Sequence, residues 1–169
     1  MVWLRGARVH SLNARWGWIV KLLLDTNIIS YWHSGQPKFR VPLGNYFRKV
    51  IRANKDVKLY VSVITIQELS CWAKPNGKWE SIKQFLNVKF ATPLSFCELC
   101  THQAANMQVR AGPNEKTSET AKAEWHHDAA IIGTAAQHEL DIIVTADKQM
   151  HTRYSSLFDQ IVHIPEAGS

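Results

Sequence analysis

Four acidic residues have the side chains and the positions in the chain to bind a divalent cation together: Asp25, Glu68, Asp128 and Asp147. Carboxylates held close together repel one another, and a bound cation relieves that repulsion. Oxygen ligands without a Cys or His partner favour hard ions, here Mg²⁺ or Mn²⁺. Such an ion activates water and neutralises phosphate charge, so the four acids predict hydrolysis of phosphodiester bonds.

The elements that must position these acids follow from the apolar runs of the sequence. Those runs predict strands at 20–25, 58–64 and 142–145, with shorter strands at 90–92 and 160–164. Helical patterns between them indicate βαβ crossovers and an α/β fold, with a parallel sheet of four or five strands covered on both faces. In such a sheet, strand C-termini and helix N-termini share one edge, where open α/β sheets bind ligands.

Each acid is expected at that edge. Asp25 ends the first strand, and Asp147 follows the 142–145 strand by two residues. Glu68, three residues after a cap predicted at Thr65, and Asp128 are expected in the first turns of two helices. The hypothesis requires that at least three of the carboxylates reach a common cation. A simpler interpretation, capping of helix N–H groups and the helix dipole, explains any single acid but accounts less well for four.

Ordered motifs run through the chain: LLLDTNIIS (22–30), VSVITIQELS (61–70), FATPLS (90–95) and HDAAIIGTAAQHELDIIVTAD (127–147). Together they resemble the PIN-domain ribonucleases, and more closely the VapC-type toxins of prokaryotic toxin–antitoxin pairs. The resemblance spans about residues 22–164. It implies a three-layer α/β/α PIN-like domain, Mg²⁺- or Mn²⁺-dependent cleavage of RNA, a homodimer and a cognate antitoxin partner.

The resemblance also implies roles for individual residues. Asp25, Glu68 and Asp128 match the main acids of the family, and Asp147 matches a fourth position that can be Asp or Asn. Asn27 and Thr145 match polar neighbours that orient the acids through hydrogen bonds, although capping and strand-end hydrogen bonding explain these two equally well. Lys148 and Arg153 follow Asp147 and are candidates for contacts with RNA phosphates. His126 and His127 precede Asp128, and either could donate a hydrogen bond to phosphate, although an ordinary helix-start role is the simpler interpretation.

Two segments depart from the family pattern. Residues 1–20 have no counterpart and are predicted to be an N-terminal extension to a single PIN-like domain at 21–165. The segment 111–124 is expected to be a surface loop, whose Lys116 and Lys122 could shape the choice of substrate.

Composition agrees with a small globular protein. The 169 residues carry a net charge of +6, which favours polyanionic partners such as RNA. The three cysteines give no disulfide framework, and the CxxC of Cys97 and Cys100 lacks the further ligands of a zinc site, so we expect two buried thiols. No segment has the length and apolar character of a signal peptide or a membrane span, so we expect a cytoplasmic protein.

Three functions could account for the four acids and the predicted fold. The first is an endoribonuclease acting as the toxin of a toxin–antitoxin pair. The second is a catalytically silent RNA-binding or scaffold protein on the same fold, which would have no need to hold four repelling carboxylates. The third is a phosphotransfer protein. It is disfavoured because the Asp-Thr-Asn at 25–27 lacks a close second Asp and no Asp ends the 58–64 strand.

Overall fold

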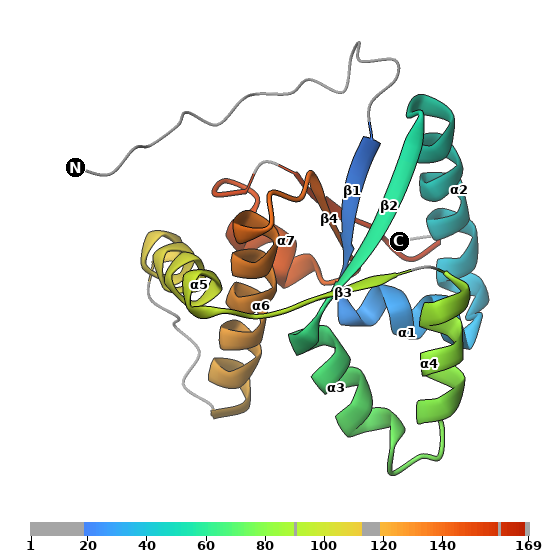
Figure 1. Ribbon diagram of the computed structural model, residues 1–169, viewed down its shortest axis with the longest axis horizontal. Coiled ribbons are helices and arrows are strands. Elements are labelled where there is room, and N and C mark those ends of the chain that lie inside the picture. Colours follow the sequence, from blue (N-terminus) through green and yellow to red (C-terminus); the bar gives the residue numbers. More distant parts are fainter. Residues whose placement is uncertain (1–18, 90, 113–118, 159, 168–169) are drawn as a thin grey trace.

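The structure of the chain is a computed structural model that describes residues 19–89, 91–112, 119–158 and 160–167 (Figure 1). Almost all of the proposed N-terminal extension, the position of Lys116 and the side chain of Lys122 lie outside the described residues. None of the described helices has the length and apolar character needed to span a lipid bilayer.

A five-stranded parallel sheet forms the centre of the fold, which confirms the predicted α/β class. Its strand order is β3-β2-β1-β4-β5, so β1 and β4 are neighbours although more than 100 residues separate them in the chain. The strands are β1 (Ile19–Leu24), β2 (Asp56–Ser62), β3 (Thr92–Leu94), β4 (Ile142–Thr145) and β5 (Ile161–His163).

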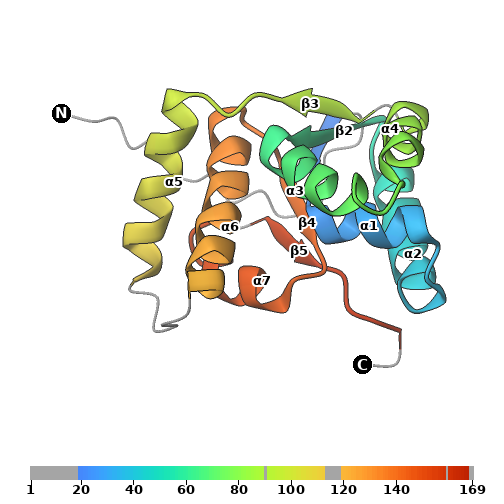
Figure 2. The ribbon, with the colours of Figure 1, turned by 90° about the horizontal axis from the view of Figure 1, so that it is seen from below.

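Helices cover both faces of this sheet, as Figure 2 shows, so the fold has the expected three layers. On one face lie α1 (Thr26–Ser34), α2 (Pro37–Ala53), α3 (Val63–Ala73) and α4 (Trp79–Val88). On the other face lie α5 (Glu98–Ala111), α6 (Glu119–Gln137) and α7 (Lys148–Tyr154).

Side-chain alternation along β1 explains why both faces need helices. Leu22 and Leu24 point into the core shared with α1 to α4, whereas Leu23 points into the core shared with α5 to α7. All three are essentially inaccessible to solvent. A strand that is apolar on both faces is stable only between two layers, so the continuous apolar run dictates the architecture.

Helix α2 begins at Pro37, because Pro is well suited to the first helical position. Several element boundaries differ from those predicted, and β3 lies two residues later than expected. Strand β2 ends at Ser62, whose hydroxyl accepts a hydrogen bond from the Ile64 amide at 3.2 Å. The cap of α3 is therefore Ser62 and not Thr65. Helix α6 begins at Glu119, within the segment expected to be a loop.

A close helix contact on the second face makes a prediction about stability. A Cβ added to Gly133 of α6 would lie 2.6 Å from the Cys100 carbonyl oxygen and 2.7 Å from the Ala104 amide nitrogen of α5. Because these are backbone atoms, we expect Gly133→Ala to lower the free energy of unfolding by about 2 kcal/mol in urea titrations.

The control is Gly44→Ala in α2, where the nearest atom lies 4.0 Å away on the Arg48 side chain. This variant should be neutral or up to about 1 kcal/mol more stable. Equal stability of the two variants would contradict the close packing.

Candidate functional site

Asp25 is the most tightly held of the predicted site residues. It follows β1 and caps α1, and its backbone amide donates to the Val144 carbonyl at 3.0 Å, which joins it to the end of β4. Its carboxylate accepts from the Thr26 amide at 2.7 Å and from the Thr145 hydroxyl at 2.6 Å. The residue is only 5% exposed. Burial raises the pKa of Asp25 to about 6, with a further rise from the charges of Glu68 and Asp147, against the two hydrogen bonds.

Thr145 and Asn27 connect the ends of the two central strands. The buried Thr145 hydroxyl donates to Asp25 and accepts from the Asp147 amide at 2.9 Å. The side-chain oxygen of Asn27 accepts from the Ala146 amide at 2.9 Å, and its NH₂ group lies 3.5 Å from the Thr145 hydroxyl. Thr145 therefore bonds directly to Asp25 and to the amide of Asp147, whereas Asn27 bonds to the segment that joins β4 to α7 and, among the residues described, not to an acid.

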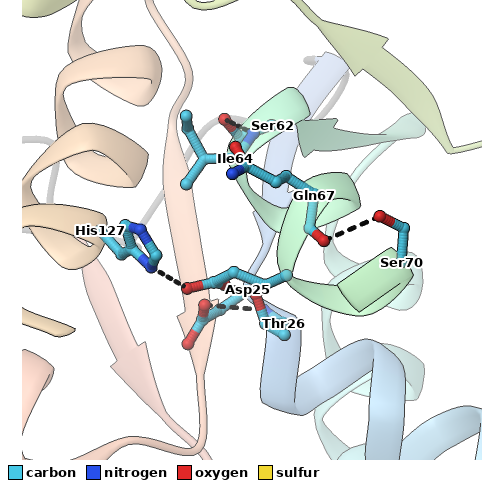
Figure 3. Close-up of polar contacts among 8 residues, drawn as sticks. Asp25, Thr26, Ser62, Ile64, Gln67, Ser70 and His127 are labelled. Atoms are coloured by element: carbon cyan, nitrogen blue, oxygen red, sulfur yellow. Dashed lines mark hydrogen bonds and ion pairs between the residues drawn. The ribbon is translucent and has the colours of Figure 1, made fainter. Parts of the chain in front are cut away.

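Glu68, on α3, lies close enough to Asp25 for its charge to raise the pKa of Asp25. One carboxylate oxygen accepts from the Thr26 hydroxyl, and the other lies 2.8 Å from Nδ1 of His127 on α6. In Figure 3, His127 points from its helix toward the group of side chains that includes Asp25 and Thr26, and the dashed line from His127 marks its contact with Glu68. Because α3 starts at Val63, Glu68 lies in its second turn, and the capping-box interpretation of Glu68 is wrong.

Asp128 has the most perturbed carboxyl group of the site. Burial raises its pKa to about 8, and the charges of Asp25, Asp147 and Glu68 add to the rise, while Arg153 opposes it. Asp128 lies in the middle of α6 and not in its first turn, contrary to the prediction. Capping and the helix dipole therefore do not explain this half-buried acid.

Helix capping, the simpler interpretation, explains the position of one carboxylate oxygen of Asp147. It caps α7, and Oδ1 accepts from the amides of Gln149 at 2.6 Å and Met150 at 3.1 Å. Of the two predicted phosphate contacts, Arg153 is half-buried and lies close enough to Asp128 to influence its pKa. Lys148 is exposed at the first position of α7.

The donor set is chemically suited to a hard cation, but its present side-chain positions do not form a cage. Across the described ranges, no group of three or more His, Cys, Asp or Glu side chains is placed to hold a metal ion, so these side-chain positions do not meet the requirement of three carboxylates at a common point. In these positions Thr26 and His127 contact the two oxygens of Glu68, and the amides of α7 contact Asp147. The buried Asp25 and the half-buried Asp128 form a mutually repelling acidic pair, which a cation would relieve.

The family model described as "PIN domain" matches residues 22–155, most of the chain and all four acids. The chain belongs to the PIN domain family. PIN domains are generally nucleases, so the family supports a hydrolase activity for this chain.

Solved structures share the fold of this PIN domain at low sequence identity. VapBC2 from Rickettsia felis, bound to a promoter DNA fragment, matches with a TM-score of 0.59 and 16% identity, over 87% of this chain and 99% of that one. VapBC-1 from nontypeable Haemophilus influenzae gives 0.58 and 20%, over 85% and 98%. A toxin–antitoxin complex from Klebsiella pneumoniae gives 0.54 and 16%, over 83% and 95%. No curated protein matches the sequence.

Sequence reasoning missed two residues of the PIN domain's acidic site. Thr26 has no role in the sequence prediction, yet its hydroxyl donates to Glu68, 42 positions away. His127 was assigned to the start of a helix, yet it contacts the same carboxylate from α6. Their positions beside Asp25 and Asp128 were the available signal. The pairing with Glu68 depends on how α3 approaches the sheet edge.

The contact of His127 with Glu68 leads to a prediction about metal binding. We expect His127→Ala to weaken Mn²⁺ binding by about tenfold, because a carboxylate that loses its orienting hydrogen bond is a poorer ligand. His127→Asn should restore most of the affinity, since its amide can donate from nearly the same place as Nδ1. The His127 side chain is 45% exposed, so the free energy of unfolding should change by less than about 1 kcal/mol in both variants. Calorimetric titration with Mn²⁺ measures the effect, and equal affinities of the Ala and Asn variants would contradict it.

Proposed function

We propose that this PIN domain is a Mg²⁺- or Mn²⁺-dependent endoribonuclease and the toxin of a toxin–antitoxin pair acting in the cytoplasm. The observation that carries the proposal is the acidic pair of the buried Asp25 and the half-buried Asp128, whose pKa values are raised to about 6 and about 8. Buried repelling carboxylates destabilise a fold, and capping does not explain Asp128. A catalytic or metal-binding role gives a reason to keep them.

The proposed ligands of the cation are Asp25, Glu68, Asp128 and Asp147. When bound, the ion would supply positive charge to the scissile phosphate and acidify water for attack on phosphorus. Asp25 is held in place by Thr145 and Thr26, so its carboxylate is oriented before substrate binds. Asp128 keeps a proton near neutral pH and would give it up as positive charge arrives. Arg153, beside Asp128, and the exposed Lys148 are placed to attract the phosphates of RNA.

A groove away from the acids supports the proposed protein partner. It has a volume of about 580 Å³ and lies between α1, α2 and α4. Its lining combines aromatic and basic side chains, among them Tyr31, Trp32, Phe47, Phe85, Arg40, Arg48 and Lys89. An antitoxin segment with apolar and acidic side chains would complement this lining. We also propose a homodimer, as the resemblance implies.

Cleavage of RNA by the purified protein tests the enzymatic part of the proposal. Labelled single-stranded RNA should be cut internally in Mg²⁺ or Mn²⁺, and EDTA should stop the reaction until the ion is restored. RNA that binds with the same affinity in either condition but is never cut would favour the silent RNA-binding protein instead. A DNA strand of the same sequence is the control for substrate class.

Growth on induced expression tests the toxin part. We expect the wild-type chain to arrest growth and Asp128→Asn to leave growth normal at an equal protein level, because the variant lacks one of the proposed ligands. Coexpression of a short DNA-binding protein encoded immediately upstream should relieve the arrest. Arrest by Asp128→Asn as severe as that by wild type would place the toxicity outside the acidic site.

A further inference from the structure

Two cysteines at the start of α5 form a pair that the acidic site does not use. Their sulfur atoms lie 3.5 Å apart. Cys97 caps the helix in an extended conformation and is exposed to solvent, whereas Cys100 is wholly buried. The expectation of two buried thiols is therefore wrong for Cys97, because that residue precedes the first turn of α5 and its side chain does not face the core.

The environments of the two thiols differ in the way that disulfide exchange requires. The Cys100 amide lowers the pKa of the Cys97 thiol most, and the Cys100 thiol and the Leu99 amide lower it further. Burial raises the pKa of the Cys100 thiol. The thiolate is the nucleophile in disulfide exchange, so the exposed Cys97 is the more reactive sulfur. Burial of Cys100 shields it from reagents in solution but not from Cys97.

We propose that Cys97 and Cys100 form a redox-active dithiol, a site of reversible modification by small disulfides such as oxidised glutathione. Cys97 is the attacking thiol and Cys100 is the resolving thiol. The geometry carries the proposal: one sulfur is open to solvent, the other is buried, and the two are already in contact. The inference does not rest on the proposed nuclease activity.

The exchange proceeds in two balanced steps. The Cys97 thiolate attacks one sulfur of oxidised glutathione, a mixed disulfide forms at Cys97, and one glutathione thiolate leaves and takes up the Cys97 proton. Cys100 then attacks the Cys97 sulfur, the bond to glutathione breaks, and the second glutathione leaves with the Cys100 proton. The protein pair is oxidised by two electrons, and one glutathione disulfide is reduced to two thiols.

Cys71 is an internal control in the same chain. It is an exposed thiol on α3, on the other face of the sheet from α5 (Figure 2). Simple exposure would give Cys71 and Cys97 the same outcome with oxidised glutathione. The proposal instead expects a glutathione adduct at Cys71 and an internal disulfide at Cys97.

The experiment is to equilibrate the full, reduced chain with mixtures of reduced and oxidised glutathione, quench with acid, alkylate, and map each cysteine by mass spectrometry. In the Cys71→Ser chain we expect the simultaneous loss of both remaining thiols and no lasting adduct. Adding Cys100→Ser should trap glutathione on Cys97, because nothing resolves it. Adding Cys97→Ser should leave Cys100 unmodified under the same conditions.

Three results would overturn the proposal. The first is a Cys97 adduct that accumulates equally with and without Cys100. The second is modification of Cys100 in the absence of Cys97. The third is a zinc ion on the reduced pair that blocks its reaction until a chelator removes the metal. Circular dichroism of each Ser variant establishes that it is folded, and a Cys100→Ala variant gives the same readout if Ser is not tolerated at the buried position.

Discussion

Asp25→Asn is expected to reduce RNA cleavage by at least about a hundredfold, and toward a thousandfold, because it removes a fixed negative charge from the proposed metal site. The change is nearly isosteric, and the side-chain oxygen of Asn can still accept from Thr145 or from the Thr26 amide. The loss should therefore come from charge and metal binding and not from unfolding. Rates measured with saturating Mn²⁺ and at several RNA concentrations separate a loss of turnover from a loss of RNA binding.

The matched control for Asp25→Asn is Glu80→Gln. Glu80 is an exposed carboxylate of α4 whose recorded partner is Lys83, at 2.8 Å. Glu80→Gln removes one negative charge from the protein, as Asp25→Asn does, so any general effect of net charge on RNA affinity appears in both variants. Cleavage by Asp25→Asn at the rate of Glu80→Gln would show that Asp25 is not catalytic, and the proposed mechanism would fail.

The second large effect is a dependence of metal-free stability on pH. Asp128 has a pKa of about 8 in the folded chain against an ordinary value of 3.8, so the folded state holds this proton more tightly. The contribution of Asp128 to stability is therefore greatest in acid and is lost as the pH rises from 3.8 toward 8. At roughly 1.4 kcal/mol per pH unit this difference corresponds to about 6 kcal/mol, and the partial exposure of Asp128 to solvent reduces the expected loss of unfolding free energy to on the order of 3 kcal/mol. Asp25, with a pKa of about 6, contributes with the same sign over a lower range.

Asp128→Asn isolates this contribution. The variant should lose less stability than wild type between pH 5 and pH 8 in EDTA, and it should exceed wild type at pH 8 by on the order of 2 kcal/mol. Urea titrations at each pH measure the difference, which cancels the effect of the other titrating groups. A wild-type profile parallel to that of Asp128→Asn would show that Asp128 ionises normally.

Added Mg²⁺ or Mn²⁺ should reverse the loss at high pH. At about a hundred times its dissociation constant, a bound ion adds about 2.7 kcal/mol, which corresponds to a rise in Tm of roughly 5–10 °C for a domain of this size. The rise should be much smaller at pH 5, where Asp128 is protonated and competes with the cation. Asp128→Asn should lose most of the response at pH 8. An equal shift in the variant would mean that the ion binds elsewhere.

The strands and their environment could be predicted from local sequence. The apolar run around Leu22 to Leu24 reads as a buried strand because a chain segment without polar alternation has no face to give to water. Asp25 and Asp147 could be placed at the sheet edge because Asp25 comes directly after such a strand and Asp147 two residues after one. Asn27 and Thr145 could be included through the resemblance to PIN domains. These residues depend on positions close in sequence, and local patterns report such positions well.

The environments of Glu68, Asp128, Cys97 and Cys100 could be determined only from the tertiary structure. The helix boundaries moved by several residues because tertiary packing overrides local capping preferences, and this removed the capping explanation for both mid-helix acids. The pairing of His127 with Glu68 joins residues 59 positions apart, and only the approach of α3 and α6 creates it. Likewise, the CxxC spacing is visible in the sequence, but only the start of α5 decides that one thiol faces water and the other the core. Local sequence thus determined which side chains reach the sheet edge, whereas burial and charge, which depend on distant neighbours, decided their chemistry.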